Sequence, residues 1–374
     1  MKKILVIHNI VHPTRTFLFN EMRKHFKSLG FSFKVIFLSQ SDKNRDWEFE
    51  NDFKFDHEVL KNHNLRFGKK DLHTFFINTD IWKKLSEENP DIILCFGWDH
   101  SSAYLARLWA YKNNKKFIFF AESTISEKSW RRTLFNPLVK FFVRRIDSFW
   151  AGGTRAKEYL MTLGVSSQKI QIFYNSVDID YFSKKCNELT LDEKNAIKKI
   201  LGITTSKTIL FVGQLIERKG IHELLEGFAQ YQKNNCDISL LIIGNGIEKE
   251  GMAEVIKNEN IQNVYFKKFA PYDEIYKYHA IADLFILPSR EEVWGLVLNE
   301  AAACGLPIIS TTVTGASIDL IENDRNGYTI EPKCPKCIAS AIEKIFANKL
   351  DIKNTSAEIV QKTNIPKMLN TIKL

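Results

Sequence analysis

Two short segments of the chain combine glycine with charged residues in patterns suited to holding a phosphate. The first reads Gly213-Gln214-Leu215-Ile216-Glu217-Arg218-Lys219-Gly220 and follows a short apolar run. Gly213 opens the turn at the end of a predicted strand, and Arg218 and Lys219 stand just ahead of a helical pattern. The planar guanidinium grips a diphosphate bidentately, while the ammonium supplies a compact charge. These two cations are therefore suited to stabilising a departing diphosphate by electrostatics, without a metal ion.

The second segment follows another apolar run and extends from Pro288 to Glu300. Gly295 permits close backbone approach, and a helix that begins at Leu296 and Val297 offers unpaired amides and a positive dipole end to an anion. Glu292 precedes this helix, where it faces the group attached to a bound phosphate. Glu300 lies about one turn inside the helix, and its carboxylate is a good acceptor for the vicinal hydroxyls of a sugar.

The apolar runs ahead of these segments belong to two series of predicted strands. In the first half the strands are predicted at 4–7, 33–38, 92–96, 117–120, 148–151 and 170–174, and in the second half at 208–212, 239–243, 264–266, 284–287, 307–311 and 327–330. Amphipathic helical patterns separate them, for example at 16–29, 101–113, 154–163, 221–231 and 297–304. Continuous apolar strands alternating with helices are typical of parallel sheets covered on both faces. The sequence therefore predicts an α/β protein with two doubly wound, Rossmann-like domains.

The domain limits follow from where the strands stop. We expect a first domain over 1–185, a polar linker over 186–206, a second domain over 207–348 and a tail over 349–374. Ligands of open α/β sheets bind outside the carboxyl ends of the strands. Two such domains face to face predict a binding site in a cleft between them.

Taken together and in order, the two charged segments resemble the group-1 glycosyltransferases, family 4 of the retaining enzymes with the GT-B fold. The spacing Glu292-x7-Glu300 matches the paired-glutamate signature of that family, and the turn from Gly213 to Gly220 matches its diphosphate-binding turn. Further matches are Ile243-Gly244-Asn245-Gly246, Ala282-Asp283-Leu284, Gly305-Leu306-Pro307, Gly315, Asn326-Gly327 and Tyr174-Asn175-Ser176-Val177-Asp178. The resemblance is strongest over residues 145–330.

The resemblance implies a reaction and a set of roles. A sugar would move from a nucleotide-diphosphate sugar to a glycan or lipid-linked acceptor, with retention at the anomeric carbon and without a metal or further cofactor. Arg218 and Lys219 would hold the diphosphate, Glu292 the donor sugar and Glu300 the ribose, and the backbone at 295–297 would hold the phosphate oxygens. The donor would bind the second domain, the acceptor the first, and the tail would pack back across the first domain. A subset of the family that acts on bacterial surface glycans, including lipopolysaccharide, resembles this version of the first domain.

The first domain departs from the common family pattern. Many relatives have a histidine after the strand equivalent to 117–120, whereas this chain has Glu122. As a strand-end carboxylate, Glu122 is either a catalytic candidate or a cap of the following turn. Four other strand-end residues are interpreted as polar lining or turn residues, namely His8, His12, Asp99 and His100.

Two other functions remain open alternatives. A nucleotide-sugar epimerase on the same scaffold would release a modified sugar without an acceptor, and a non-catalytic protein would bind a sugar nucleotide without turnover. A dehydrogenase is disfavoured, because the glycines around 244–251 lack dinucleotide-binding spacing and the next strand leads into lysines rather than an acidic residue.

The charge distribution and the cysteines indicate which partners and which cellular compartment to expect. Residues 1–185 contain 31 Lys and Arg against 20 Asp and Glu, so the basic excess of the chain lies in its first half. The segment 130–145 mixes aromatic residues and cations, which suits either a helix on an anionic membrane surface or one packed on the sheet. No nucleic-acid recognition motif accompanies the charge. With no export signal recognised, we expect a cytoplasmic protein, peripheral at the membrane, whose six cysteines are reduced and whose Cys334-x-x-Cys337 pair is incidental.

Overall fold

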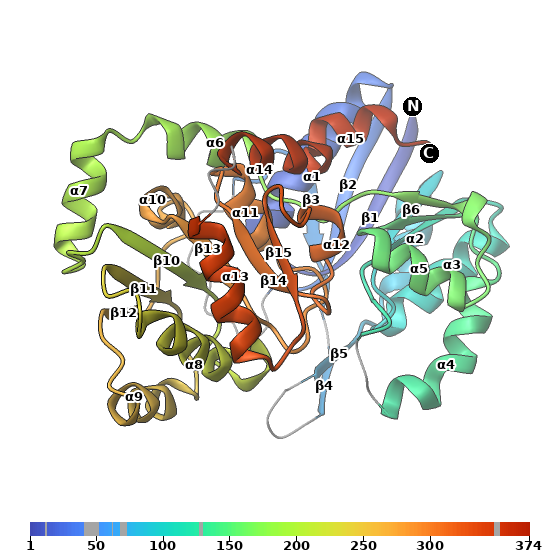
Figure 1. The fold of residues 1–374 in the computed structure, drawn as a ribbon. Helices are drawn as coiled ribbons and strands as arrows, with labels where there is room; N and C mark the ends of the chain where they lie inside the picture. Colours follow the sequence, from blue (N-terminus) through green and yellow to red (C-terminus); the bar gives the residue numbers. More distant parts are fainter. Residues whose placement is uncertain (12, 41–51, 62, 68–72, 127–129, 348–351) are drawn as a thin grey trace. The chain divides into compact units, whose positions relative to one another are not determined.

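The computed structural model of this chain describes every residue except 12, 41–51, 62, 68–72, 127–129 and 348–351. Contacts divide it into two compact units (Figure 1). The first unit contains residues 1–175 together with 365–374, and the second contains 176–364. Among the described helices, none has the length and apolar character needed to cross a membrane.

The first unit is built on a parallel sheet of strand order β3-β2-β1-β6-β7-β8-β9. Its strands are β1 (Lys2–Ile10), β2 (Phe31–Ser39), β3 (Asp56–Val59), β6 (Ile92–Phe96), β7 (Lys116–Ala121), β8 (Ser148–Ala151) and β9 (Ile170–Ile172). Its helices are α1 (Pro13–Ser28), α2 (Ile81–Glu88), α3 (Ser101–Lys112), α4 (Trp130–Val143), α5 (Thr154–Thr162), a short 3-10 turn η1 (Ser167–Lys169) and α15 (Ile365–Thr371). A separate antiparallel pair joins β4 (His63–Phe67) and β5 (His73–Ile77).

Alternation along the strands gives this sheet two buried faces. In β1, Leu5 and Ile7 belong to one apolar cluster, while Ile4 and Val6 belong to the other. The first cluster is completed by residues of α2, α3, α4 and α5, and the second by α1 and α15. Because both faces are covered, each strand is a continuous apolar run, which is the pattern that the sequence shows.

The second unit repeats the design with strand order β12-β11-β10-β13-β14-β15. Its strands are β10 (Lys207–Val212), β11 (Ile238–Ile243), β12 (Val264–Lys267), β13 (Leu284–Leu287), β14 (Ile308–Thr311) and β15 (Gly327–Ile330). Its helical segments are α6 (Ile179–Glu188), α7 (Leu191–Ile200), η2 (Glu217–Lys219), α8 (Ile221–Gln232), α9 (Lys249–Asn258), α10 (Ile275–Ile281), α11 (Leu296–Ala303), α12 (Ser317–Leu320), α13 (Pro335–Ala347), α14 (Ile352–Val360) and η3 (Gln361–Thr363). Helices α13 and α8 pack side by side (Figure 1).

The sheet order has the same turning point in both units. From β1 the chain runs outward through β2 and β3, then returns to β6 on the other side of β1. From β10 it runs through β11 and β12, then returns to β13. The loops after β10 and β13 therefore meet at the carboxyl edge of the second sheet, where doubly wound proteins bind their ligands.

Comparison with the sequence expectations confirms the two doubly wound α/β domains and each predicted strand. Strand β3 and the β4–β5 pair were not predicted. The reason is visible in β3, whose residues Asp56-His57-Glu58-Val59 form a mostly polar edge strand without an apolar run.

The division between the units differs from the predicted limits. The second unit begins at Ser176 rather than after residue 185, and the stretch predicted as a linker over 186–206 forms the end of α6 and α7. Both helices pack on α10, which ties them to the second unit. Of the predicted tail, α14 packs on α11 in the second unit, and the first unit receives only residues 365–374.

The cysteines also differ from expectation. The structure pairs Cys186 with Cys304 and Cys334 with Cys337, with Cα separations of 5.6 Å and 5.2 Å. The first bond arises because α6 packs against α11, and the second closes one turn at the start of α13. Cys95 and Cys236 are free. The expectation of fully reduced, incidental thiols is therefore wrong for this structure.

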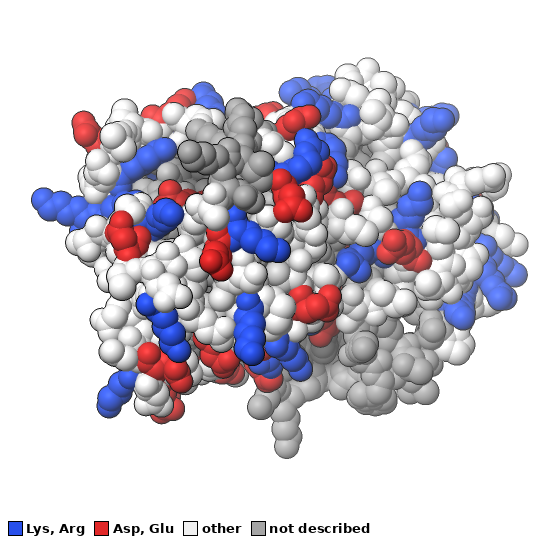
Figure 2. Space-filling model, in the orientation of Figure 1, with Lys and Arg blue, Asp and Glu red and all other residues white. Residues whose placement is uncertain are grey.

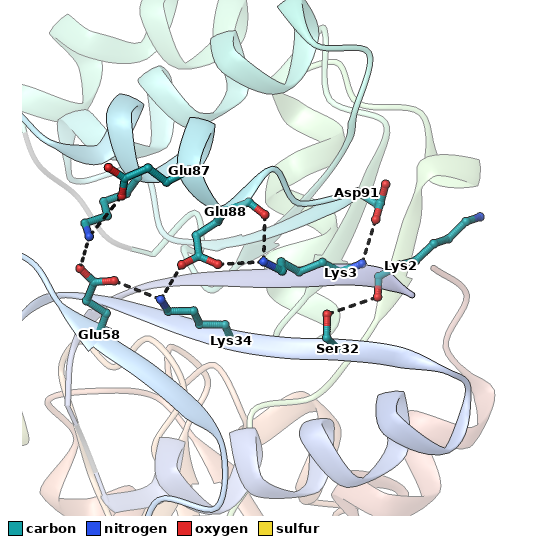
Figure 3. A network of polar contacts seen from close by, with 9 residues as sticks. Lys2, Lys3, Ser32, Lys34, Glu58, Glu87, Glu88 and Asp91 are labelled. Atoms are coloured by element: carbon teal, nitrogen blue, oxygen red, sulfur yellow. Dashed lines mark hydrogen bonds and ion pairs between the residues drawn. The ribbon is translucent and has the colours of Figure 1, made fainter.

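A network of ion pairs lies near the amino end of the first sheet (Figure 3). Lys34 Nζ lies 2.6 Å from Glu88 Oε1 and 3.1 Å from Glu58 Oε2. Glu88 also accepts from Lys3 at 2.9 Å, and Glu58 lies 2.6 Å from Lys84. Each of these two carboxylates thus has two cationic partners. On the face shown in Figure 2, Lys and Arg side chains are interspersed with Asp and Glu side chains.

Candidate functional site

The loop after β10 is held close to the loop after β13 by a glycine and a backbone hydrogen bond. Gly220 has φ 68°, and a Cβ atom there would collide with the carbonyl oxygen of Pro288. Nearby, the Arg290 amide donates to the Arg218 carbonyl at 2.8 Å. Glycine is required at position 220 for both conformation and space, so the turn carrying Arg218 and Lys219 is fixed against the second loop.

This arrangement brings together three of the predicted site residues. Lys219 forms an ion pair and hydrogen bond with Glu292. Arg218 Nη1 lies 3.9 Å from the same carboxylate oxygen and donates to the Glu291 carbonyl at 3.0 Å. The Lys219 and Glu292 side chains are each 13% exposed, and that of Arg218 is 35% exposed. One carboxylate therefore serves two cations at the edge of the sheet.

A second ion-pair cluster, which sequence reasoning missed, braces the two loops. Arg290 Nε donates to Glu223 Oε1 at 2.8 Å, and the same guanidinium pairs with Glu217. Glu223 lies in the first turn of α8, and Glu217 opens the turn that carries Arg218. Because Arg290 joins the two loops through side chains as well as backbone, Arg218 and Lys219 stand on a preorganised support.

The start of α11 matches the predicted anion site in backbone shape. Gly295 has φ 92°, and the Leu298 amide donates to its carbonyl at 2.9 Å, so the helix begins directly after Gly295. Leu296 and Val297 are half-buried at the first turn. The preceding loop is clamped, since the Gly315 amide donates to the Glu292 carbonyl at 3.0 Å. A helix start of this kind presents amides and a positive dipole end to a phosphate.

Gly213 has a supporting position in the structure. Its amide donates to the Ile243 carbonyl at 3.0 Å, at the end of the β10–β11 ladder. A Cβ atom on Gly244 would collide with the Gly213 carbonyl oxygen, so the two glycines allow the strand ends to approach closely. The structure thus engages the Gly213 amide within the protein and gives this residue a role in shaping the turn.

Glu300 is buried one turn inside α11 and has two neighbours that the sequence did not single out. His279 of α10, itself fully buried, places Nε2 3.4 Å from Glu300 Oε2. Burial, with the nearby Glu300 charge, raises the pKa of Tyr272 well above its usual value. Among the described residues, neither His279 Nδ1 nor the Tyr272 hydroxyl has a hydrogen-bond partner. These donors lie within the same polar cluster as the carboxylate.

The helix that carries Glu300 is also fixed by a buried chain of hydrogen bonds. Trp294 Nε1 donates to Asn299 Oδ1 at 2.8 Å, and Asn299 Nδ2 donates to Thr363 Oγ1 at 3.0 Å. Asn299 and Thr363 are fully buried. These contacts fix the first turns of α11, on which Glu300 follows Asn299.

Glu122 lies in the first unit, directly after β7 and on a different sheet from the residues above. Its carboxylate pairs with Arg15 of α1, whose guanidinium also donates to Asn175 Oδ1 at 3.1 Å. The Arg15 guanidinium carbon lies 5.4 Å from the centre of the Phe96 ring. The Glu122 side chain therefore has a specific cationic partner, separated from it by 107 residues, which the sequence reading did not assign.

His8 and His100, two of the strand-end residues interpreted as lining or turn residues, make local structural contacts. His100 caps α3, because its Nδ1 accepts the Ala103 amide at 3.0 Å while Nε2 contacts the Phe96 carbonyl at 3.0 Å. Burial lowers its pKa, so it is neutral at neutral pH. His8 is buried, with Nδ1 2.9 Å from the Ile10 carbonyl oxygen. His12 lies outside the described residues. Within the described part of the chain, no group of His, Cys, Asp and Glu has the arrangement of a metal site.

Comparison with known protein families identifies both halves of the chain. Residues 193–363 match the model for "Glycosyl transferases group 1", and residues 18–181 match that for "Glycosyltransferase Family 4". The two matches leave only short stretches of the chain uncovered. The chain belongs to the group-1, family 4 glycosyltransferases.

Individual curated glycosyltransferases are similar to parts of the chain. The capsular polysaccharide biosynthesis glycosyltransferase CapM of Staphylococcus aureus is 34% identical over 141 residues, which are 36% of each chain. The N-acetyl-alpha-D-glucosaminyl L-malate synthase of Bacillus anthracis is 29% identical over 198 residues, 52% of this chain and 49% of that protein. The chain therefore aligns with about half of the length of the malate synthase and with about a third of the length of CapM.

The solved structures extend the comparison to the whole chain. HepE of Anabaena, whose crystal structure is a complex with UDP, has a TM-score of 0.78 at 15% identity and covers 99% of this chain and 98% of its own. At this level of identity the likeness establishes the fold, which is GT-B with two Rossmann-like domains.

Proposed function

We propose that the protein transfers a sugar from a nucleotide-diphosphate sugar to a glycan or lipid-linked acceptor. The observation that carries this proposal is the Lys219–Glu292–Arg218 cluster at the carboxyl edge of the second sheet, beside the open start of α11. Family membership supports the same reaction class, and the UDP complex of HepE supports a nucleotide-linked donor.

Donor binding would exchange ionic partners. Without donor, Glu292 neutralises Lys219 and lies near Arg218. A diphosphate arriving at the start of α11 would take over both cations, because its two phosphates carry more charge than a single carboxylate. Glu292 would then be released to accept hydrogen bonds from the donor sugar. The cations stabilise the charge that develops on the leaving diphosphate.

The buried end of the site would hold the nucleoside. Glu300 accepts hydrogen bonds from the ribose hydroxyls, and its neighbours His279 and Tyr272 fix the carboxylate or contribute further hydrogen bonds. A buried carboxylate next to two donors is a specific partner for a vicinal diol, because unpaired polar groups at such a site are costly.

The proposed stereochemical outcome is retention at the anomeric carbon. No covalent nucleophile is assigned, and the leaving phosphate takes the acceptor proton as the acceptor hydroxyl attacks from the same face. The glycosidic bond to phosphate breaks while the new bond to the acceptor oxygen forms. Glu122, paired with Arg15, would bind an acceptor hydroxyl in the first unit.

The proposed setting is bacterial surface-polysaccharide synthesis on the cytoplasmic side of the cell membrane, where nucleotide sugars are made. The similarity to CapM supports this setting, and lipopolysaccharide is the alternative product of the same class.

The first experiment measures thermal stabilisation by a panel of nucleotide sugars, beginning with UDP-sugars. A donor at about 100 times its dissociation constant adds roughly 2.7 kcal/mol to the stability of the unit that binds it. The shift should be reduced in Arg218→Ala and preserved in Arg325→Ala, a matched control in which the lost arginine is exposed and paired only locally with Glu322.

The same panel separates the alternatives. A stabilising donor that is converted to another sugar without any acceptor would identify an epimerase. Binding without turnover in the presence of acceptors would identify a sugar-nucleotide binding protein. A well-folded protein that responds to no nucleotide sugar would overturn the proposed transferase function.

A further inference from the structure

Two neighbouring stretches of the first unit are entirely free of acidic residues. Residues 101–116 and 130–146, which include α3 and α4, contain nine Lys and Arg and no Asp or Glu. Elsewhere in the same unit, cations such as Lys34 and Lys84 are neutralised by carboxylates. The positive charge of the first half of the chain is therefore concentrated, in part, on two helices without internal compensation.

The same two helices expose large apolar side chains. On α3, Leu108 is 40% and Tyr111 is 68% exposed, and on α4, Leu138 is 48% and Phe141 is 55% exposed. These residues are spaced three apart on each helix, so each pair lies on one helix face. Exposing four large apolar side chains to water is unfavourable, and such an exposed apolar patch is typical of an interaction site.

Contacts between the helices join the exposed residues into one surface. The guanidinium carbon of Arg145 lies 5.7 Å from the ring centre of Tyr111 and 5.9 Å from that of Phe141. Arg107 approaches the Phe141 ring at 5.8 Å. We call this set the α3–α4 surface: Arg107, Leu108, Tyr111, Leu138, Phe141, Arg144 and Arg145. Its centre is apolar and aromatic, Arg107 and Arg145 lie over the rings, and Arg144 is exposed next to Arg145 in the chain.

The cations of this surface are available to an anionic partner. Among the described residues, no carboxylate lies within ion-pair distance of Arg107, Arg144 or Arg145, and Arg107 Nε has no hydrogen-bond partner. Burial and the neighbouring Arg145 charge lower the pKa of Arg107. The acidic residue next along the chain, Asp147, accepts the Phe117 amide at 2.8 Å and so is used within the sheet.

We propose that the α3–α4 surface docks the first unit onto a bilayer rich in anionic phospholipid. The arginines meet the lipid phosphates, while Phe141, Leu138 and Tyr111 enter the headgroup region, where aromatic and apolar side chains are favoured. The exposed apolar centre argues for lipid over nucleic acid, because protein–nucleic acid interfaces are predominantly polar. Docking is independent of the proposed reaction, since it needs neither donor nor acceptor.

Vesicle co-sedimentation of the full chain tests this surface. The vesicles contain phosphatidylcholine alone or with about one third phosphatidylglycerol. Binding should require the anionic lipid and weaken as salt is raised. At about 1 kcal/mol for each cation near the surface, Arg144→Gln with Arg145→Gln should weaken binding about 30-fold. Leu138→Ser with Phe141→Ser should weaken it at least about tenfold and reduce the residual binding at high salt.

Matched controls are available on α7. Leu191 and Ile200 are 73% and 84% exposed, and Lys194 and Lys199 share that helix. Leu191→Ser with Ile200→Ser removes the same kind of apolar surface, and Lys194→Gln with Lys199→Gln removes the same charge; both should leave vesicle binding unchanged. Thermal unfolding verifies that every variant is folded.

Three outcomes would overturn the proposal. They are equal binding to neutral and anionic vesicles, α3–α4 variants that bind like the α7 controls, and salt-sensitive binding to duplex or single-stranded nucleic acid with none to vesicles. None of these results bears on sugar transfer, which is measured separately with soluble donor.

Discussion

Two ion-pair clusters, one in each unit, differ in how their charges are shared. In the network of Figure 3, Glu58 and Glu88 each have two lysine partners, and Lys34 joins them from the middle of a strand. At the edge of the second sheet, Glu292 alone serves Arg218 and Lys219, and all three lie on loops or a 3-10 turn. The first cluster is complete within the protein, whereas the second has cations that share a single carboxylate.

This difference separates a structural cluster from a binding one. A network whose members each have several partners on regular elements loses stability when any member is removed, because the remaining buried groups lose their compensation. A cluster in which two cations share one carboxylate on preorganised loops is ready to exchange that carboxylate for a ligand. We therefore expect mutations in the two regions to affect different measurements.

The largest expected effect is that of Glu292→Gln on the proposed reaction. Without the carboxylate, Lys219 and Arg218 lose their competing partner, so a nucleoside diphosphate should bind several-fold more tightly. Transfer should fall about 100-fold, because the donor sugar loses a hydrogen-bonded carboxylate in the transition state. Calorimetric titration of the nucleotide and initial-rate measurement of transfer check the two effects.

The signs of these two effects must be opposite. If Glu292→Gln weakens nucleotide binding and transfer together, the carboxylate is needed to hold the loop rather than to compete for the cations. Glu322→Gln, which removes an exposed carboxylate paired only with Arg325, is the matched control and should change neither quantity.

An intermediate effect is expected from Lys34→Met, which breaks the network at its centre. Glu88 and Glu58 would lose a partner in a partly buried position, at a cost of about 1 kcal/mol, or a decrease of roughly 2–4 °C in the unfolding temperature. Nucleotide affinity should be unchanged, because Lys34 lies in the other unit. Lys83→Met is the control, since Lys83 is 79% exposed and paired only at 3.8 Å.

The smallest effect concerns pH. Hydrogen bonds from Lys84 lower the pKa of Glu58, and the Lys3 amide lowers that of Asp91. Burial opposes ionisation of Glu88, but the bonds from Lys34 and Lys3 outweigh it and lower its pKa as well. Groups with a lowered pKa contribute stability above their unfolded values near pH 4, and this stability is lost as pH falls through the folded values.

Thermal unfolding followed between about pH 6 and pH 3 should therefore show an acid destabilisation of the first unit that is shallower in Glu88→Gln. An unchanged slope in this variant would mean that the network does not hold Glu88 ionised in the folded protein.

Much of this fold was readable from the sequence because buried parallel strands are apolar runs and their helices keep a regular period. The same regularity predicts the order of strands and loops, so the sequence places Arg218, Lys219 and Glu292 after neighbouring strands, and the structure brings these three side chains together. The Glu292-x7-Glu300 spacing is a local pattern, since Glu292 lies on the loop before α11 and Glu300 lies within that helix; their roles stay a prediction.

The remaining features depend on contacts between distant segments. Arg15 meets Glu122 across 107 residues, and Arg290 meets Glu223 across 67. The Cys186–Cys304 pair spans 118 residues and exists because α6 packs on α11. Contacts between residues so far apart in the chain cannot be predicted from a local hydrophobic period or a short motif. His279, the neighbour of Glu300, comes from α10, to which the sequence analysis assigned no role.

The first unit is built from two segments of the chain that are separated by the whole second unit, and this has a consequence for biosynthesis. Its core includes Ile365, Met368 and Leu369 of α15, which pack with residues of β1, α1 and β2. On the ribosome, the chain up to residue 175 emerges long before residues 365–374 are made, because the 189 residues of the second unit lie between them. While the second unit is synthesised, the part of this apolar face that α15 covers is therefore still exposed, and the first unit cannot complete its core until residues 365–374 have emerged.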